Sequence, residues 1–261
     1  MKIASFNVNS IKARLPNLVD WLKEAEPDVV CLQELKCTDE NFPHGPIEDL
    51  GYNVAVNGQK TYNGVAILSK YPLEDVSRGL PGNDGDDHAR YIEAVVSANG
   101  SVVRVASIYL PNGNPVDTDK FTYKLSWMDR LIDHARGLLA YEEPLVLAGD
   151  YNVIPTIDDV HDPAAWANDA LFRPETRAKF RELTNLGLTD AFRACHREAH
   201  RYTFWDYQAG AWTKDNGIRI DHLLLSPQAA DRLKGSDIDR AVRGREKPSD
   251  HVPIWVELDI G

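Results

Sequence analysis

Residues 91–110, YIEAVVSANGSVVRVASIYL, contain two runs rich in β-branched residues on either side of one polar turn. The runs at residues 91–96 and 102–110 have the composition of strands. The dipeptide Asn99-Gly100 between them is a strong signal for a hairpin with a two-residue turn. Because a hairpin places its strands antiparallel, this stretch predicts an antiparallel sheet and argues against a strictly alternating parallel fold.

Further strand and helix candidates lie on both sides of this hairpin. A strand at residues 3–8 precedes a helix that Ser10 is expected to cap and that should end before Pro27. Two more helices are expected at residues 121–140 and 175–186. The remaining strand candidates are residues 29–32, 52–56, 65–69, 145–148, 202–207, 219–225 and 252–258. Strands, hairpins and helices in this mixture predict an α/β fold of two packed sheets flanked by helices.

Composition indicates an ordinary globular chain. Its 261 residues are 43% hydrophobic and 26% charged, which is enough for a large core. No repeat or linker interrupts the sequence, so we expect a single domain over residues 1–261. The formal charge of −11 argues against indiscriminate binding to nucleic acid or anionic membranes. A phosphate ligand would therefore need a local cationic patch or a metal ion.

The sequence contains no sign of membrane insertion or disulfide bonding. No apolar segment approaches the roughly 18 residues of a spanning helix, and the N-terminus lacks the apolar centre of a signal peptide. The three cysteines, Cys31, Cys37 and Cys195, lack paired zinc-ligand spacing. We expect a soluble, cytoplasmic protein without a membrane partner, and a monomer, since no sustained heptad pattern occurs.

Five strand candidates run into polar residues, which are Asn7, Gln33-Glu34, Tyr109, Asp150 with Asn152, and Asp221. Any one of them alone could be an ordinary turn residue. Five together favour a shared site. Carboxylate and amide oxygens without thiolates suit magnesium or manganese, and Glu34, Asp150 and Asp250 are the candidate anionic ligands.

The segment Pro248-Ser249-Asp250-His251 places a histidine directly after an acid. Neighbouring residues of an extended chain point to opposite sides, so Asp250 is not expected to orient His251. Asp221 is the candidate for that role. A buried pair of this kind would raise the pKa of the histidine and present a cation to phosphate. A packing or surface histidine is the alternative.

Seven short runs carry a resemblance to a known family: FNVN at 6–9, LQELK at 32–36, YLPNG at 109–113, AGDYN at 148–152, YTFWDY at 202–207, NGIRID at 216–221 and PSDH at 248–251. In this order they resemble the exonuclease III type of abasic-site endonucleases, within the endonuclease/exonuclease/phosphatase superfamily. The bacterial exodeoxyribonuclease III branch is the most similar. The resemblance covers nearly the whole chain, because the runs extend from residue 6 to residue 251.

The resemblance implies a four-layer α/β sandwich and a metal-dependent DNA repair nuclease that uses Mg²⁺ or Mn²⁺. Its substrates would be double-stranded DNA with abasic sites or blocked 3′ ends. The implied activities are hydrolysis of the phosphodiester 5′ to an abasic site, 3′ to 5′ exonuclease and 3′-end trimming. The products of incision would be a 3′-hydroxyl and a 5′-phosphate.

The resemblance also implies residue roles at matching positions. The catalytic residues would be Tyr109, Asp150, Asn152, Asp221 and His251, and the surroundings of the metal would be Asn7, Glu34, Asp150, Asn152, Asp250 and His251. Asp150 would activate the attacking water, and Asn152 would stabilise the transition state. Tyr109 would contact the phosphate or the leaving oxygen, while His251, oriented by Asp221, would hold a non-bridging oxygen.

Substrate recognition is expected from an apolar pocket for an extruded sugar, formed by Phe204, Ile218 and Ile220. Trp212 would lie on a loop pressed into the DNA groove, and Asn112 and Arg90 would add contacts. Other candidate phosphate contacts are Lys36, Lys120, Lys124, Arg173 and Lys247. The acidic runs at residues 84–87 and 158–159 are expected to be solvated loops.

Two other functions remain open from sequence. A phosphoesterase with the same catalytic centre could act on a small phosphoester such as an inositol phosphate. A non-catalytic DNA-binding homologue could retain the fold alone, although no central ligand is lost.

Overall fold

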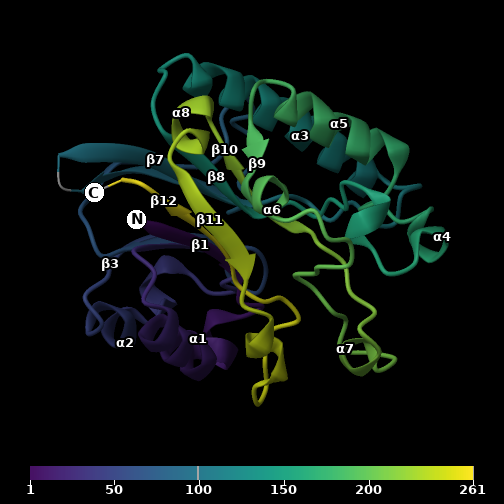
Figure 1. The fold of residues 1–261 in the computed structure, drawn as a ribbon, viewed down its shortest axis with the longest axis horizontal. Helices are drawn as coiled ribbons and strands as arrows, with labels where there is room; N and C mark the ends of the chain where they lie inside the picture. The colour runs from purple at the N-terminus through teal and green to yellow at the C-terminus, as the bar shows by residue number, and fades with distance from the viewer. Residues whose placement is uncertain (99, 261) are drawn as a thin grey trace.

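Two six-stranded sheets pack face to face between two layers of helices (Figure 1), in a computed structural model that describes residues 1–98 and 100–260. The order of the first sheet is β11 (Leu233–Ile238), β12 (Ile254–Leu258), β1 (Lys2–Asn7), β2 (Val29–Gln33), β4 (Val65–Ser69) and β3 (Asn53–Asn57). The order of the second is β5 (Leu73–Arg78), β6 (Tyr91–Ala98), β7 (Ser101–Tyr109), β8 (Leu145–Asp150), β10 (Asp221–Leu225) and β9 (Thr189–Asp190). The predicted α/β sandwich of two mixed, largely antiparallel sheets is confirmed.

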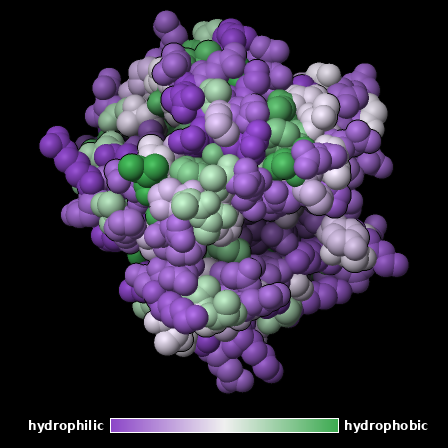
Figure 2. Space-filling model, turned by 90° about the vertical axis from the view of Figure 1, so that its right-hand side faces the viewer, coloured by the Kyte–Doolittle hydropathy of each residue, from purple (hydrophilic) through white to green (hydrophobic). Residues whose placement is uncertain are grey.

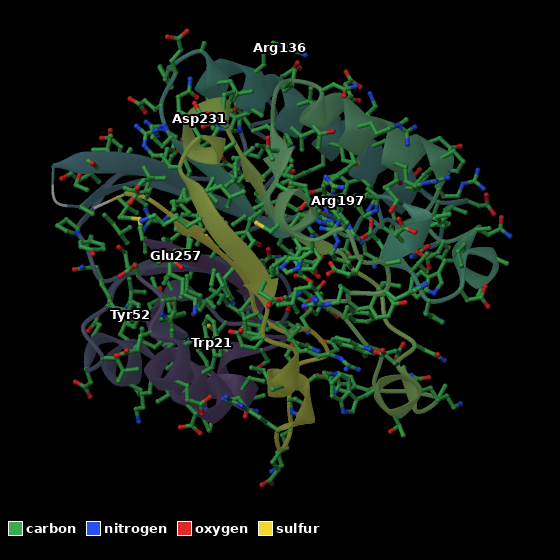
Figure 3. All side chains as sticks on the ribbon, in the orientation of Figure 1. Trp21, Tyr52, Arg136, Arg197, Asp231 and Glu257 are labelled. Carbon is green, nitrogen blue, oxygen red and sulfur yellow. The ribbon has the colours of Figure 1, made fainter. Side chains whose placement is uncertain are left out.

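The helices form the two outer layers. Helices α1 (Ile11–Ala25) and α2 (His44–Glu48) lie outside the first sheet, and α3 (Asp119–Leu139) and α5 (Pro174–Thr184) lie outside the second (Figure 1). Trp21 of α1 and Tyr52 accordingly lie in the lower part of the molecule, whereas Arg136 of α3 lies at the opposite surface (Figure 3). No described helix is long and apolar enough to cross a bilayer.

The pairing of the strands brings their polar ends to one edge of the sandwich. Each sheet contains one parallel pair, β1 with β2 and β7 with β8, so the carboxyl ends of these strands are adjacent. In the second sheet Asp150 is the register partner of both Tyr109 and Asp221. Close approach of β7 and β8 requires glycine at position 149, because a Cβ there would lie 2.0 Å from the carbonyl oxygen of Ile108.

Several predicted elements agree closely with the structure. Strand β4 has the expected bounds, and β6 and β7 pair antiparallel from Tyr91↔Ile108 to Ala98↔Ser101. The predicted turn includes Asn99, which lies outside the described residues. Helix α1 begins after Ser10 and ends at Ala25, but Ser10 makes no side-chain capping bond. Its backbone N–H donates instead to the carbonyl oxygen of Glu34 at 2.8 Å, which ties the helix to the end of β2.

The expected strand at residues 202–207 is wrong. The structure has only isolated bridges there, from Phe204 to Ile218 and from Phe204 to His251. This backbone is wedged between two loops, since the N–H of Phe204 donates to Ile218 and that of Trp205 to Asp250. Strands β5, β9 and β11 were not predicted from sequence, because β5 and β11 carry charged or glycine residues and β9 has two residues.

Short helical segments complete the chain and carry its longer connections. They are η1 (Asp39–Asn41), η2 (Ile157–Asp159), α4 (Pro163–Trp166), α6 (Ala191–Cys195), α7 (Ala211–Lys214), α8 (Pro227–Ala230) and η3 (Arg240–Gly244). Helices α4 and α7 lie on the same side of the molecule, at the right of Figure 1.

Candidate active site

Three titratable side chains from distant parts of the chain meet at the polar edge of the two sheets. Ligand atoms of Glu34, Asp150 and His251 all lie within 4.8 Å of one another. Glu34 follows β2 of the first sheet, Asp150 ends β8 of the second, and His251 precedes β12. The two sheets therefore each contribute one carboxylate to a common centre.

Glu34 is held in a left-handed backbone conformation, with φ 53°. This conformation is uncommon for a residue with a side chain and often occurs at functional sites. The Glu34 carboxylate accepts a hydrogen bond from Asn7 at 2.9 Å and pairs with the ammonium of Lys36 at 2.9 Å. Burial opposes its ionisation, but Lys36 and Asn7 outweigh burial and hold the pKa of Glu34 below its usual range.

Asn7 connects the two carboxylates. Its Nδ2 donates to Glu34 and, at 2.9 Å, to Oδ2 of Asp150, while its Oδ1 accepts from the backbone N–H of Asn9 at 3.0 Å. Asn7 thus presents a donor to the centre of the site and its oxygen to the backbone. In this arrangement it positions both acids.

Asp150 and Asn152 form a tight turn directly after β8. Oδ1 of Asp150 accepts the N–H of Asn152 at 2.9 Å, and Asn152 is left-handed with φ 47°. Nδ2 of Asn152 donates to the carbonyl oxygen of Leu110 at 2.9 Å, and Nδ2 of Asn112 reaches Oδ1 of Asn152 at 3.3 Å. Burial raises the pKa of Asp150 to about 7, against the opposing charge of His251.

His251 lies between two buried acids. Its Nδ1 is 2.9 Å from Oδ2 of Asp221, and its Nε2 is 3.7 Å from Oδ2 of Asp150. Burial disfavours the imidazolium, but the two carboxylates outweigh burial and raise the pKa of His251 to about 10. A doubly protonated ring has no lone pair for a metal. These contacts favour a role for His251 in holding an anionic oxygen rather than in binding a metal.

Tyr109 lies beside the acids with its hydroxyl protonated. Burial, followed by the charges of Glu34 and Asp150, raises the pKa of the phenol well above its usual value. The guanidinium of Arg90 lies 4.9 Å from the centre of the Tyr109 ring and donates to its backbone carbonyl at 3.3 Å. Tyr109 can therefore donate a hydrogen bond to an oxygen in the site.

A cavity of about 300 Å³ opens onto this centre. Its lining includes the acids Glu34, Asp150 and Asp250, the proposed contacts Tyr109, Asn112, Asn152 and His251, and the apolar residues Trp166, Leu171, Phe204 and Ile220. The face that carries α4 and α7 is turned to the viewer in Figure 2, where a hollow is rimmed mainly by hydrophilic residues.

The remaining predicted site residues lie nearby in different settings. Oδ1 of Asp250 accepts from Asn9 at 3.0 Å, and Asp250 lies outside the three-residue cluster. Ile218 is buried and lines an adjoining cavity rather than the catalytic one. Trp212 lines neither of these two cavities, and its ring packs edge-on against Trp205 with centroids 4.9 Å apart.

A buried ionic network behind the site was not predicted from sequence. Arg219 is fully buried and donates to Asp159 at 2.7 Å and to Asp190 at 2.8 Å, and Arg193 also pairs with Asp159. The expectation that residues 158–159 form a solvated loop is therefore wrong for Asp159, which is fully buried. These arginines hold the pKa of Asp159 below its usual range, although burial acts in the opposite direction.

Lys124, a candidate phosphate contact in the sequence, is a second correction. It is fully buried, and its ammonium donates to the carbonyl oxygens of Pro111 at 3.0 Å and Asn152 at 2.7 Å. Gly113 leaves room for it, because a Cβ there would lie 2.5 Å from Cδ of Lys124. Lys124 therefore joins the loops that follow β7 and β8. A lone lysine on a helix gives no sequence signal for this role.

Comparison with known proteins agrees with this fold and site. The model of the Endonuclease/Exonuclease/phosphatase family matches residues 4–251. Exodeoxyribonuclease III of Haemophilus influenzae is 34% identical, over 99% of this chain and 100% of that protein. Solved structures of an AP endonuclease from Archaeoglobus fulgidus and of the 3′-5′ exonuclease NExo from Neisseria meningitidis are 38% and 39% identical, with TM-scores of 0.93 and 0.94 and full coverage of both chains.

The fold is an α/β sandwich in which each sheet contributes an acid to one centre and a histidine lies between two carboxylates. This arrangement is typical of a phosphoesterase. The chain belongs to the Endonuclease/Exonuclease/phosphatase family. The resemblance inferred from the seven sequence runs is confirmed.

Proposed function

We propose that this chain is a metal-dependent DNA repair nuclease that incises the phosphodiester 5′ to abasic sites and trims 3′ ends of duplex DNA. The observation that carries the proposal is the placement of His251 between Asp221 and Asp150, beside the carboxylate of Glu34. The similar proteins named above support DNA as the substrate, as does a solved NExo 3′ phosphatase bound to a product DNA hairpin.

The donor set fits a hard divalent cation. Glu34 and Asp150 supply carboxylate oxygens, and the part of the chain that the structure describes brings no thiolate to the cluster. Burial makes ionised Asp150 costly, and a cation would offset that cost. We propose Mg²⁺, with Mn²⁺ as a substitute, held by Glu34 and Asp150 with Asp250 and Asn152 beside it. When bound, the metal supplies positive charge that polarises a phosphoryl oxygen.

The side chains supply the remaining requirements of phosphodiester hydrolysis. Asp150, as a buried carboxylate with a raised pKa, accepts a proton from the attacking water. His251 holds a non-bridging oxygen with the proton on Nε2, while Asp221 fixes the ring through Nδ1. The second amide hydrogen of Asn152 and the Tyr109 hydroxyl donate to oxygens that gain charge in the transition state.

A cationic recess next to the catalytic cavity supports binding of a DNA backbone. It measures about 290 Å³ and is lined by Glu34 and Tyr109, which it shares with the catalytic cavity, and by Lys36, Arg90, His88 and the exposed Tyr62. The chain has a net charge of −11, so binding of a DNA backbone requires local positive charge, which Lys36 and Arg90 provide in this recess. We propose that the strand continues across this recess.

The test uses a duplex with one internal abasic analogue and Mg²⁺. We expect incision 5′ to the analogue that EDTA abolishes and added Mg²⁺ restores. Asp150→Asn should remove the activity, whereas Asp133→Asn, a substitution of an exposed acid on α3, should retain it. Absence of incision with Mg²⁺ or Mn²⁺ would reject the proposal.

The same purified protein can be used to test the alternative that the substrate is a small phosphoester. Turnover of inositol phosphates at a rate above that of DNA would favour a small-molecule phosphoesterase. A single domain, a monomer in solution and a cytoplasmic location remain parts of the proposal, and size-exclusion chromatography with light scattering tests the monomer.

A further inference from the structure

A second cavity, of about 280 Å³, adjoins the catalytic cavity and shares Trp166, Phe204 and Asp206 with it. Its other lining residues include Ile218 and residues of the segment around α7. We propose that this side cavity is a nucleobase subsite, which receives the base of a 3′-terminal nucleotide while its phosphodiester lies at the catalytic centre. The inference rests on the proposed nuclease function and names one part of its substrate.

The walls of the side cavity suit a flat aromatic ligand. Trp166, at the end of α4, and Phe204 are both partly buried and pack against a buried apolar cluster that contains Ile218. Their rings are therefore supported from behind. Aromatic side chains stack on bases of any sequence, because every base has a π face. Such a subsite suits an enzyme that removes successive nucleotides whatever their base.

The polar rim matches the edge of a base. Gln208 and Asn216 line the cavity, and no hydrogen bond among the described residues occupies their side-chain amides. Each amide offers both donors and an acceptor. His161 also lines it, and its Nδ1 lies 3.1 Å from the carbonyl oxygen of Gly217, so the ring is oriented and Nε2 is left for another partner.

The charge of the side cavity favours a base over a second phosphate. Its lining includes the carboxylate of Asp206 and, in the described chain, no lysine or arginine. A phosphate placed there would face an anion without a cationic partner. A neutral base meets no such penalty. The recess with Lys36 and Arg90 shares Glu34 and Tyr109 with the catalytic cavity and no lining residue with the side cavity, and it is the better site for the backbone.

The side cavity also lies at a suitable distance from the catalytic centre for a base whose phosphate is bound there. The ring of Phe204 lies edge-on to that of His251, with centroids 5.0 Å apart, and Phe204 lines both cavities. The Phe204 ring therefore lies between His251, which is proposed to bind the phosphate, and the side cavity. The width of one ring is about the size of the sugar that joins a base to its phosphate. An abasic sugar has no base and would leave the side cavity empty.

The experiment compares two substrates in the same variant. Trp166→Ala should lower kcat/KM for release of a 3′-terminal nucleotide roughly 10-fold more than kcat/KM for incision at an internal abasic analogue, because only the first substrate loses a stacking partner. The ratio of the two values is independent of the folded fraction. Trp166→Phe should restore most of the ratio, and Ile157→Ala, at a 62% exposed position outside the lining of both cavities, should leave it unchanged.

Product inhibition gives a second test of whether the side cavity binds a base. A deoxynucleoside 5′-monophosphate should inhibit the wild-type chain more strongly than deoxyribose 5-phosphate, and Trp166→Ala should reduce that difference. An equal effect of Trp166→Ala on both substrates, or no effect on either, would overturn the base subsite and leave the nuclease proposal standing. Absence of hydrolysis of both DNAs by the wild-type chain would overturn the two proposals together.

Discussion

The ammonium of Lys124 lies 2.7 Å from the carbonyl oxygen of Asn152, in a setting from which solvent is excluded. Lys124 forms no ion pair within the described part of the chain, and its charge is satisfied by two backbone carbonyls. Burial lowers its pKa to about 7. Backbone carbonyls that converge on one donor fix the relative position of their loops. Lys124 is therefore a positioning residue for Asn152 and for the loop that begins at Tyr109.

Replacing Lys124 with methionine should weaken both the fold and the site. The carbonyl oxygens of Pro111 and Asn152 lose their shared donor, and we expect a loss of about 1–3 kcal/mol in the free energy of unfolding. Displacement of Asn152 should lower kcat roughly 10- to 100-fold. Urea unfolding and single-turnover kinetics measure these effects. Lys23→Met, a substitution of an exposed lysine on α1, is the matched control, and equal kcat in the two variants would contradict the positioning role.

His251 and Asp150 should each prove essential for rate. His251→Ala or Asp150→Asn removes an acid–base or charge-stabilising group, so we expect kcat to fall by at least roughly 100-fold. Circular dichroism checks that each variant is folded. His44→Ala, an exposed histidine on α2, is the control and should retain wild-type activity. A variant of His251 or Asp150 within a few-fold of wild type would refute the role given to that residue.

Asp221 should set the charge of His251. Its Oδ1 has no hydrogen-bond partner in the described structure, so the carboxylate is compensated chiefly through Oδ2 by His251. Asp221→Asn keeps the size of the side chain but removes its charge. The pKa of His251, raised to about 10 in the wild type, should then fall toward the ordinary value of about 6.5. Nuclear magnetic resonance titration measures it directly, and an unchanged pKa would exclude this pairing as the cause.

Metal activation should depend more on Glu34 than on Asp250. Glu34 belongs to the three-residue cluster, whereas Asp250 lies outside it and accepts from Asn9. Glu34→Gln should raise the Mg²⁺ concentration for half-maximal activity roughly 10-fold or more, because half of the charge of the Glu34–Asp150 pair is lost. Asp250→Asn should cause a smaller shift. Activity and calorimetric titrations with Mg²⁺ test this order, and the reverse order would place the metal nearer Asp250.

The fold could be predicted from sequence where its signals are local. The hairpin at residues 91–110 combines alternating β-branched strands with a turn dipeptide, and its pairing is as expected. The backbone around Phe204 has similar composition but no strand, because its hydrogen bonds go to Ile218 on one side and Asp250 on the other. An extended segment becomes a β-strand only if a neighbouring strand accepts and donates its backbone hydrogen bonds. The amino-acid composition of the segment does not show which neighbour it will have.

The centre of the site could also be predicted from sequence, because its residues lie where apolar strands meet polar residues. Asn7 and Asp150 end β1 and β8, whereas Asp221 begins β10. Because β10 runs antiparallel to β8, Asp221 lies at the same edge as Asp150. The supporting residues gave no such signal. Asp159 meets Arg219 across 60 positions, and an acid in a polar loop looks the same whether it is solvated or buried.

The buried network behind the site should make stability sensitive to pH through His222. Its Nδ1 accepts from Arg219 at 3.0 Å and its Nε2 donates to the carbonyl oxygen of Val153 at 2.9 Å, so the ring is neutral. Burial, followed by the charge of Arg219, lowers its pKa to about 4, against about 6.5 in the unfolded chain.

Between these two values the unfolded chain binds a proton that the folded chain does not, so stability falls as pH decreases from about 6.5 to about 4. From pH 7 to pH 5 this group should cost about 2 kcal/mol in the free energy of unfolding. His222→Gln keeps an acceptor and a donor but cannot titrate, and its stability should fall less over that interval. Urea unfolding at both pH values measures the difference, with His44→Gln as the exposed control. Parallel losses in His222→Gln and the wild type would show that another group carries the pH dependence.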